Sequence, residues 1–232
     1  FQEKAKKAGL KPIIGMEGYI TAPNRRMTDR DNKIDGRPHH LLMLAKNETG
    51  YKNLLKIASA SQLQGYYYRP RIDNDFLAAH SEGLIVTSGC LASQIPSMIM
   101  DGRDDAARAQ IDWYLQVFGK ENFYLELQEH DIPELRTVNT WLTDIGRRDD
   151  VQFVATNDVH YVMDNDYDPH DTLLCIQTSA LKSEANRMRM TDNSYFLSSP
   201  EQMWKHFCHA DKRRPLLTTG QVAEMVHLHT DR

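Results

Sequence analysis

Hydrophobic positions along the chain follow two different periods. Short, unbroken apolar runs bounded by turn residues, such as residues 84–88, predict buried strands. Segments whose apolar residues recur every three or four positions, such as residues 47–61, predict helices. The two kinds of segment alternate along the whole chain. This alternation is typical of parallel βα units rather than of a β-sandwich.

The bounds of each element follow from these runs and from the capping residues at their ends. Strands are predicted at residues 11–15, 16–20, 39–45, 84–88, 122–127, 153–155 and 195–197. Helices are predicted at residues 1–8, 47–61, 73–79, 92–100, 103–118, 133–147 and 166–177. A further helix begins at a capping box formed by Ser199 and Gln202, with Pro200 at its first position. Residues 21–38 and 64–71 are polar and are predicted to be loops.

Two possible metal ligands follow the predicted strand at residues 153–155. Asp158 and His160 are two positions apart, so on an extended chain their side chains point the same way and can converge on one ion. A carboxylate beside an imidazole suits zinc, manganese or iron. An ordinary strand end, with Asp capping the next helix, explains the same residues, and both interpretations stay open.

Other predicted strands also begin or end on residues that can bind a metal. Glu17 lies among apolar residues, where an unpaired carboxylate costs several kcal/mol and so calls for a partner or a metal. Cys90 follows the strand at residues 84–88, and the pair His39 and His40 opens the strand at residues 39–45. In α/β barrels the chemistry is assembled at the carboxyl ends of the strands. We therefore favour a barrel over an open doubly wound sheet, and a metal-dependent hydrolase as the function.

Tyrosines and arginines alternate in the loop at residues 64–71. Tyr66, Tyr67, Arg69 and Arg71 could stack bases and hold the phosphates of a single DNA strand. They could equally cover the mouth of the barrel or contact another domain.

A second basic segment contains Arg187 and Arg189 and is a further candidate for guiding a DNA strand. No GxGxxG or GxxxxGK[ST] phosphate loop is present in the sequence, which weakens the nucleotide-binding alternatives.

Composition limits the class of protein. With 232 residues, 41% of them hydrophobic, the chain is expected to fold as one domain. A net charge of −4 argues against a surface that coats nucleic acid, although bound cations could still attract a phosphodiester. Three widely spaced cysteines, with no signal peptide and no long apolar segment, predict a cytoplasmic protein without membrane contact. Because the chain opens at Phe1 inside a predicted helix, we expect it to be a fragment.

Nine segments resemble, in order and spacing, the PHP (polymerase and histidinol phosphatase) domain at the N-terminus of bacterial DNA polymerase III alpha subunits. They are KPIIGMEGYI, HHLLMLAKNETGYKNLLKIAS, GYYYRPRID, HSEGLIVTSGCLAS, FYLELQEH, VATNDVHY, LLCIQT, NRMRM and YFLSSPEQMW. The resemblance covers nearly the whole chain. It implies residues 1–232 as a single PHP domain, with residues from about 200 onward leading toward a following polymerase domain.

The resemblance implies a distorted (βα)7 barrel with up to three divalent metal ions at the carboxyl ends of its strands. Carried over residue by residue, the ligands are Glu17, His40, Cys90, Asp158 and His160. Glu17, Asp158 and His160 would be catalytic. The family's opening strand, with its HxH pair and following Asp, and its TDH motif would lie before Phe1, so the barrel is expected to be incomplete and inactive on its own.

The implied reaction is hydrolysis of a phosphodiester, as a 3′–5′ exonuclease that acts on the mispaired, single-stranded 3′ end of a primer. The implied partners are DNA, downstream polymerase domains of the same subunit and a separate proofreading subunit. One alternative is a non-catalytic module that stabilises the polymerase and docks that subunit. A small-molecule phosphatase is the second alternative and ranks last.

The tail of the chain contains a further HxH pair, His227 and His229. In a circularly permuted barrel this pair could replace the missing opening strand, since first and last strands are neighbours in a closed barrel. Residues 220–225 also read as the end of a helix, and we favour that ordinary interpretation.

Overall fold

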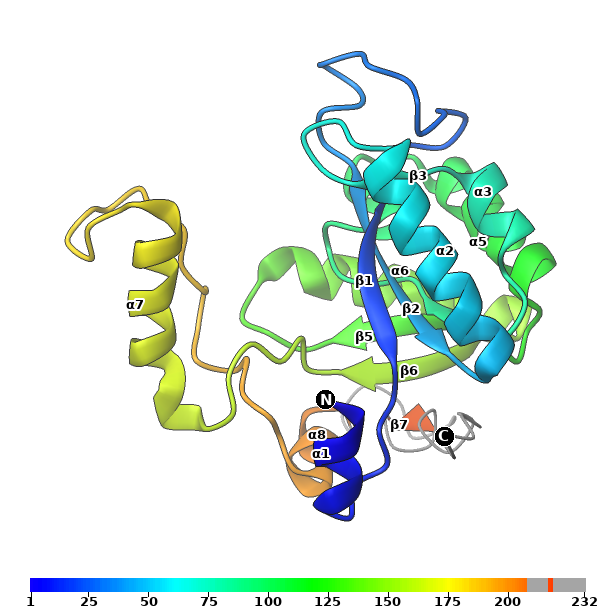
Figure 1. The fold of residues 1–232 in the computed structure, drawn as a ribbon. Coiled ribbons are helices and arrows are strands. Elements are labelled where there is room, and N and C mark those ends of the chain that lie inside the picture. Colours follow the sequence, from blue (N-terminus) through cyan, green and yellow to red (C-terminus); the bar gives the residue numbers. More distant parts are fainter. Residues whose placement is uncertain (208–216, 219–232) are drawn as a thin grey trace.

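A computed structural model describes residues 1–207 and 217–218 of the chain (Figure 1). The helices are α1 (Gln2–Lys7), α2 (Glu48–Leu63), α3 (Asn74–Ala79), α4 (Gln94–Met100), α5 (Asp104–Phe118), α6 (Pro133–Asp149), α7 (Tyr167–Thr178) and α8 (Pro200–Phe207), with a 3-10 turn at Asp164–Asp166. The strands are β1 (Gly15–Ile20), β2 (His39–Ala45), β3 (Arg71–Ile72), β4 (Leu84–Thr87), β5 (Phe123–Gln128), β6 (Gln152–Thr156) and β7 (Leu217–Thr218).

Local sequence signals place most of these elements correctly. The Asn47 side chain accepts a hydrogen bond from the Gly50 N–H (3.0 Å) and so caps α2. The capping box of α8 is confirmed, because Ser199 N–H donates to Gln202 Oε1 (2.7 Å) and Gln202 N–H donates to Ser199 Oγ (3.3 Å). The predicted strand at residues 195–197 is instead a single bridge between Tyr161 and Phe196, and β3 was not predicted.

All seven strands form one sheet in the order β3-β1-β2-β4-β5-β6-β7. Strand β2 pairs antiparallel with both β1 and β4, whereas the other neighbouring strands pair parallel. Strand β2 is therefore the one reversed strand of this sheet. The prediction of parallel units throughout is wrong here, because residues 21–38 lead from β1 into β2 without a crossover helix.

The sheet has two unequal faces. Alternate residues of the strands, such as Met43, Val86 and Leu125, belong to a large core packed under the helices. Their neighbours face the other way, where Ile85, Tyr124 and Val154 form a small second cluster. Polar side chains extend along this second face, which we call the inner face, and it carries the candidate site.

The fold class is mixed α/β, and a closed (βα)7 barrel is not confirmed. Strands β3 and β7 lie at the two ends of the sheet order, so the described part of the sheet is open. In Figure 1, β1 runs nearly vertically, β2 runs obliquely, and β5 and β6 run nearly horizontally, which shows that the sheet is strongly twisted. Helix α7 stands apart from the helical layer. Nowhere in the described chain is there a helix of the length and apolarity that crossing a membrane requires.

Candidate metal centre

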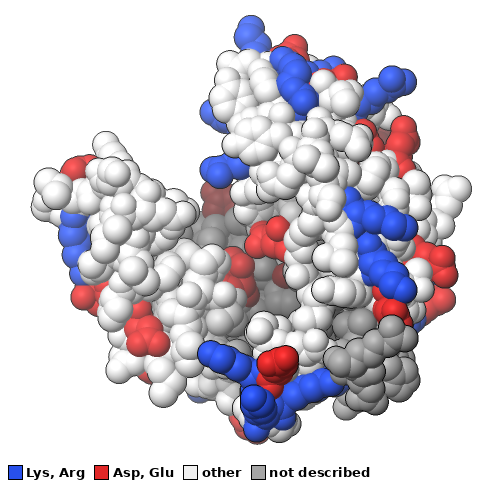
Figure 2. Space-filling model, in the orientation of Figure 1, with Lys and Arg blue, Asp and Glu red and all other residues white. Residues whose placement is uncertain are grey.

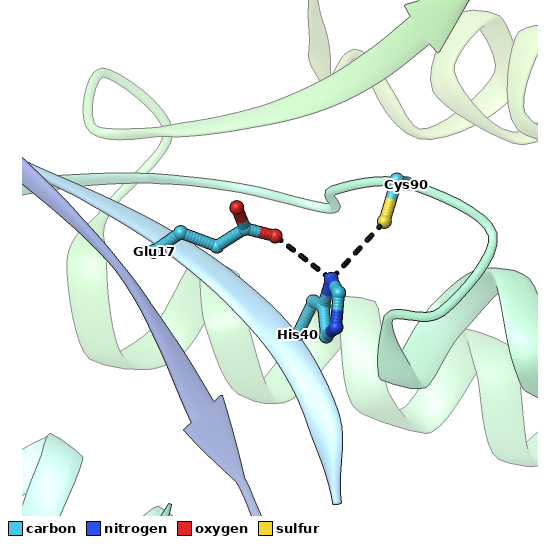
Figure 3. A group of neighbouring side chains, drawn as sticks. All are labelled: Glu17, His40 and Cys90. Atoms are coloured by element: carbon cyan, nitrogen blue, oxygen red, sulfur yellow. Dashed lines mark hydrogen bonds and ion pairs between the residues drawn. The ribbon is translucent and has the colours of Figure 1, made fainter. Parts of the chain in front are cut away.

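Glu17, His40 and Cys90 lie together on the inner face of the sheet (Figure 3). Glu17 Oε1 lies 2.7 Å from His40 Nδ1, and Cys90 Sγ lies 3.6 Å from the same nitrogen. One ligand atom from each residue falls within 4.8 Å of the other two. Within residues 1–207 and 217–218 this is the one such group, and we call it the triad.

The reversal of β2 explains how His40 joins the triad. Glu17 lies on β1, and Tyr19 of the same strand pairs with His40. Because β2 runs opposite to its neighbours, the beginning of β2 lies at the edge of the sheet where β1 and β4 end. His40 N–H also donates to the Ala92 carbonyl (3.2 Å), which ties β2 to the turn that carries Cys90.

The turn after β4 depends on Gly89. This residue has a φ of 74°, in the left-handed region that favours glycine. A Cβ atom at this position would lie 2.1 Å from Ser93 Oγ, so a side chain would force the turn to move. Gly89 therefore allows Cys90 to face the inner side of the sheet.

Alternation along β2 distinguishes the two neighbouring histidines. The His40 side chain points to the inner face, toward Glu17. The His39 side chain points to the opposite face, where its Nδ1 lies 3.5 Å from Ser97 Oγ. Burial lowers the pKa of His39. The choice of His40 over His39 as the candidate ligand agrees with this geometry.

The triad holds a proton tightly when no cation is present. The adjacent Cys90 sulfur and the Glu17 carboxylate raise the pKa of His40 to about 10. The hydrogen bond from His40 in turn lowers the pKa of Glu17. The positive charge on His40 thus lies where a cation would be attracted.

The donor set of the triad fits a divalent metal ion. Carboxylate oxygen, imidazole nitrogen and thiolate sulfur are all ligands of zinc, and three protein ligands leave a position for substrate. The side chains of Glu17 and His40 are 59% and 35% exposed, so an ion can reach them from solvent. Figure 2 shows a hollow between α7 and the part of the molecule that carries β1 and α2, with acidic side chains exposed inside it.

Asp158 and His160 do not lie in the triad. Strand β6 ends at Thr156, and Asp158 has a φ of 43°. The prediction of an extended chain at these residues is therefore wrong, and the two side chains do not simply point the same way. His160 Nδ1 instead lies 2.6 Å from the carbonyl oxygen of Asp158. A hydrogen bond there leaves Nε2 with its lone pair, as is usual for a histidine that binds a metal.

The loop that carries Asp158 and His160 is held by a distant segment. The side-chain amide of Asn157 donates to the carbonyls of Ser194 (2.8 Å) and Phe196 (2.6 Å). His160 N–H donates to the Tyr195 carbonyl (2.9 Å). The positions of Asp158 and His160 are thus determined by contacts with residues 194–198 rather than by strand pairing.

The aromatic and basic candidates are divided between the surface and the interior. Tyr66 is 56% exposed, and Arg69 is also exposed, whereas Tyr67 is half-buried. Arg71 is fully buried, and its guanidinium donates to the carbonyls of four residues: Gly65, Asp35, Met27 and Asp29. The prediction that Arg71 contacts DNA does not fit this position, because its donors are already used inside the protein.

Arg187 and Arg189 also differ in exposure, since the side chain of one is buried and that of the other lies on the surface. Both terminal nitrogens of Arg187 bind the Asp171 carboxylate, at 2.5 and 2.7 Å, and its side chain is only 6% exposed. Its predicted DNA contact is likewise not supported by its position, because this ion pair occupies the guanidinium. Arg189 is exposed.

Two residues of the inner face, Tyr19 and Glu126, were not among the predicted site residues. The ring of Tyr19 meets the ring of His40 edge-on, with centroids 5.2 Å apart. Glu126 is 6% exposed and accepts hydrogen bonds from Thr87 (2.5 Å), Thr156 (2.5 Å) and Gln128 (3.0 Å). An acidic residue inside an apolar strand, the signal that identified Glu17, also identifies Glu126. His227 and His229 lie outside the described residues.

The profile of the family described as "PHP domain" matches residues 1–130, which is more than half of the chain. The chain belongs to the PHP domain family. The matched part of this PHP domain contains the whole triad, whereas Asp158 and His160 follow it.

Curated relatives extend the similarity beyond residue 130. The chain is 44% identical over 224 residues to the DNA polymerase III subunit alpha of Borreliella burgdorferi, covering 97% of this PHP domain chain and 19% of the relative. It is 38% identical over 224 residues to the subunit of the same name in Treponema pallidum, with the same coverage. With that of Thermus aquaticus, identity is 41% over 226 residues, covering 97% and 18%. The chain thus spans about a fifth of the length of these relatives.

Proposed function

We propose that this PHP domain hydrolyses phosphodiesters with bound divalent metal ions. The proposed substrate is the mispaired, single-stranded 3′ end of a primer, so the activity is that of a 3′–5′ exonuclease within a replicative DNA polymerase. The proposed partners are DNA and the polymerase domains of the same subunit. The assembled triad carries the proposal, because it presents three different metal donors to solvent at one point of the inner face.

Each candidate ligand has its own role in this proposal. Glu17, His40 and Cys90 would hold one ion, and the Nε2 atom of His160 and the carboxylate of Asp158 would hold another. When bound, such ions act as Lewis acids toward the phosphodiester. The hydrogen bond between His160 and the Asp158 carbonyl orients the imidazole ring. Glu126 and its three hydrogen-bond donors join β4, β5 and β6, and so support the strands that lead to Cys90 and to Asp158 and His160.

The experiment compares two cysteines in a polymerase subunit that contains this chain. Cys90→Ala removes a triad member, whereas Cys175→Ala removes a buried cysteine on α7 outside the triad. We expect Cys90→Ala to lower both the metal content and the trimming of a 3′-mispaired primer in the presence of manganese or zinc. Primer extension by Cys90→Ala should stay close to wild type. For Cys175→Ala, metal content, trimming and primer extension should all stay close to wild type.

Two other results would contradict this function. Equal metal content and equal trimming in wild type and Cys90→Ala would remove the triad from the reaction. Wild-type metal binding without any trimming would favour the alternative, a structural and docking module. Asp158→Asn and His160→Ala extend the test to the second ligand pair, and both should slow trimming.

A further inference from the structure

An exposed arginine stands beside the triad without an acidic partner. The Cζ atom of Arg69 lies 5.8 Å from the centre of the Tyr19 ring, and the Tyr19 ring contacts the ring of His40. Arg69, Tyr19 and His40 therefore form a continuous series of contacts that ends in the triad. In the part of the chain that the structure describes, no carboxylate pairs with Arg69. Its guanidinium is thus available to an anion from solution.

The turn that presents Arg69 is held in place by contacts of Tyr67. Tyr67 N–H donates to the Arg69 carbonyl (3.0 Å), and Tyr68 has a left-handed φ of 59°. The Tyr67 ring contacts two guanidiniums, those of Arg30 and Arg71, each with its Cζ 5.3 Å from the ring centre. Arg71 is itself anchored on four backbone carbonyls. A left-handed tyrosine is unfavourable and persists only where surrounding contacts hold it.

The chemistry of this turn suits a DNA strand. A guanidinium binds two oxygens of a phosphate through parallel N–H groups, and packing on an aromatic ring reduces its freedom beforehand. Tyr66 and Tyr68 are 56% and 60% exposed on the same turn, so their rings are open to bases. Base stacking on exposed aromatic rings is the usual partner of phosphate binding in single-strand recognition.

We propose that Arg69, supported by the Tyr19 ring, binds the phosphate next to the one that is cleaved at the triad. This makes Arg69 and Tyr19 positioning residues that select a polynucleotide strand over a small phosphate ester. The inference rests on the proposed function, because it takes the triad as the place of cleavage.

The test measures binding of a short, fluorescently labelled oligothymidylate to the polymerase subunit that contains this chain. A saturating primer–template duplex occupies the polymerase site during the measurement. Arg69→Ala should weaken oligothymidylate binding about tenfold, as expected for loss of a charged hydrogen-bond donor. The slope of log affinity against log salt should fall by about 0.7, the value for one phosphate contact on a single strand.

Matched variants separate this role from general effects of charge or folding. Arg136→Ala removes the same charge from α6, on the helical layer, where the side chain is 75% exposed, and should leave binding unchanged. Tyr19→Phe keeps the ring and should bind like wild type, whereas Tyr19→Leu should bind more weakly. Metal content should stay at the wild-type level in Arg69→Ala.

A substrate comparison adds a second readout. Thymidine 5′-(p-nitrophenyl phosphate) has no neighbouring phosphate, so Arg69→Ala should leave its hydrolysis unchanged while raising KM for a single-stranded oligonucleotide. Equal oligothymidylate affinity and equal salt slope in Arg69→Ala and wild type would overturn the inference. If wild type cleaves neither substrate but Arg69→Ala still weakens binding, the proposed nuclease function fails and the strand-binding role stands.

Discussion

The triad and the Asp158–His160 loop contain similar side chains of types that can bind a metal, but they are built in different ways. Glu17 and His40 are held by the register of two paired strands, and Cys90 follows a third strand of the same sheet. Asp158 and His160 lie beyond the end of β6, in a loop fastened by hydrogen bonds to residues 194–198. The triad is therefore assembled by strand pairing, whereas the second pair depends on a few side-chain and backbone contacts.

This difference has a consequence for binding. Ligands on paired strands keep their spacing when a nearby loop opens, because the ladder hydrogen bonds persist. Ligands on a loop lose their spacing when the loop opens, and such local opening requires much less free energy than global unfolding. We therefore expect the triad to bind the first metal ion and the loop to open more readily than the paired strands.

The largest effect is expected at Arg71, which fastens residues 21–38 beside the triad. Arg71→Met removes the donor for four carbonyls, three of them in buried hydrogen bonds, and we expect a loss of about 3–5 kcal/mol in the free energy of unfolding. The control is Arg69→Met, two positions earlier on the surface, which should change stability by less than about 0.5 kcal/mol. Urea unfolding measures both, and equal midpoints for the two variants would contradict the difference.

The next largest effect is expected within the triad itself. His40→Ala should weaken binding of zinc at least about 100-fold, since even changes around a metal ligand typically cost about 10–100-fold. His39→Ala, one position away on the opposite side of β2, should change zinc affinity less than about twofold. Titration calorimetry separates the two, and similar losses in both variants would mean that His40 is not the ligand.

A substitution at Asn157 tests whether its hydrogen bonds hold the Asp158–His160 loop in place. Asn157→Ala leaves the Ser194 and Phe196 carbonyls without their donor, and each such loss costs about 1–3 kcal/mol. Amide hydrogen exchange should then become faster at residues 158–161 and 194–198 but not in β1, β2 or β4. Asn193→Ala, an exposed neighbour, is the control. Unchanged exchange in Asn157→Ala would show that the Asn157 hydrogen bonds do not hold the loop.

A pH dependence confined to the triad is also expected. A metal ion must displace the proton from His40, whose pKa is raised from 6.5 to about 10. Zinc or manganese affinity should therefore rise about tenfold per pH unit between pH 7 and 9 and level off above about pH 10. Without metal, the stability of the fold changes with pH in the opposite direction to metal affinity. Stabilisation by the protonated His40 is complete below pH 6.5 and is lost as the pH rises through about 10.

His40→Ala is the control for this pH dependence. The variant lacks the proton that metal binding displaces, so its weaker metal affinity should rise less steeply with pH than that of wild type. Equal slopes in the two proteins would mean that a different group releases the proton.

Much of the local structure was determined by the sequence alone. Asn47, Ser199 and Gln202 form their helix caps wherever the rest of the chain lies, because each cap involves residues only three apart. Apolar runs identify most of the strands, because the period of a run is a local property of the sequence. They do not identify β3, and the run at residues 195–197 forms only an isolated bridge. The sequence also identified residue types suited to metal binding near strand ends, including Glu17 and Cys90.

Only the tertiary structure decided which of these residues meet. The reversal of β2 brings His40 to the ends of β1 and β4, and no local signal in residues 39–45 reports strand direction. Arg69 and Arg71 look alike in sequence, yet one faces solvent and the other binds four carbonyls from distant segments. Tyr19 became a candidate only because its ring contacts His40 on the neighbouring strand and the guanidinium of Arg69. Contacts between residues far apart in the chain depend on packing, and the hydrophobic pattern of one segment does not determine which distant segment packs against it.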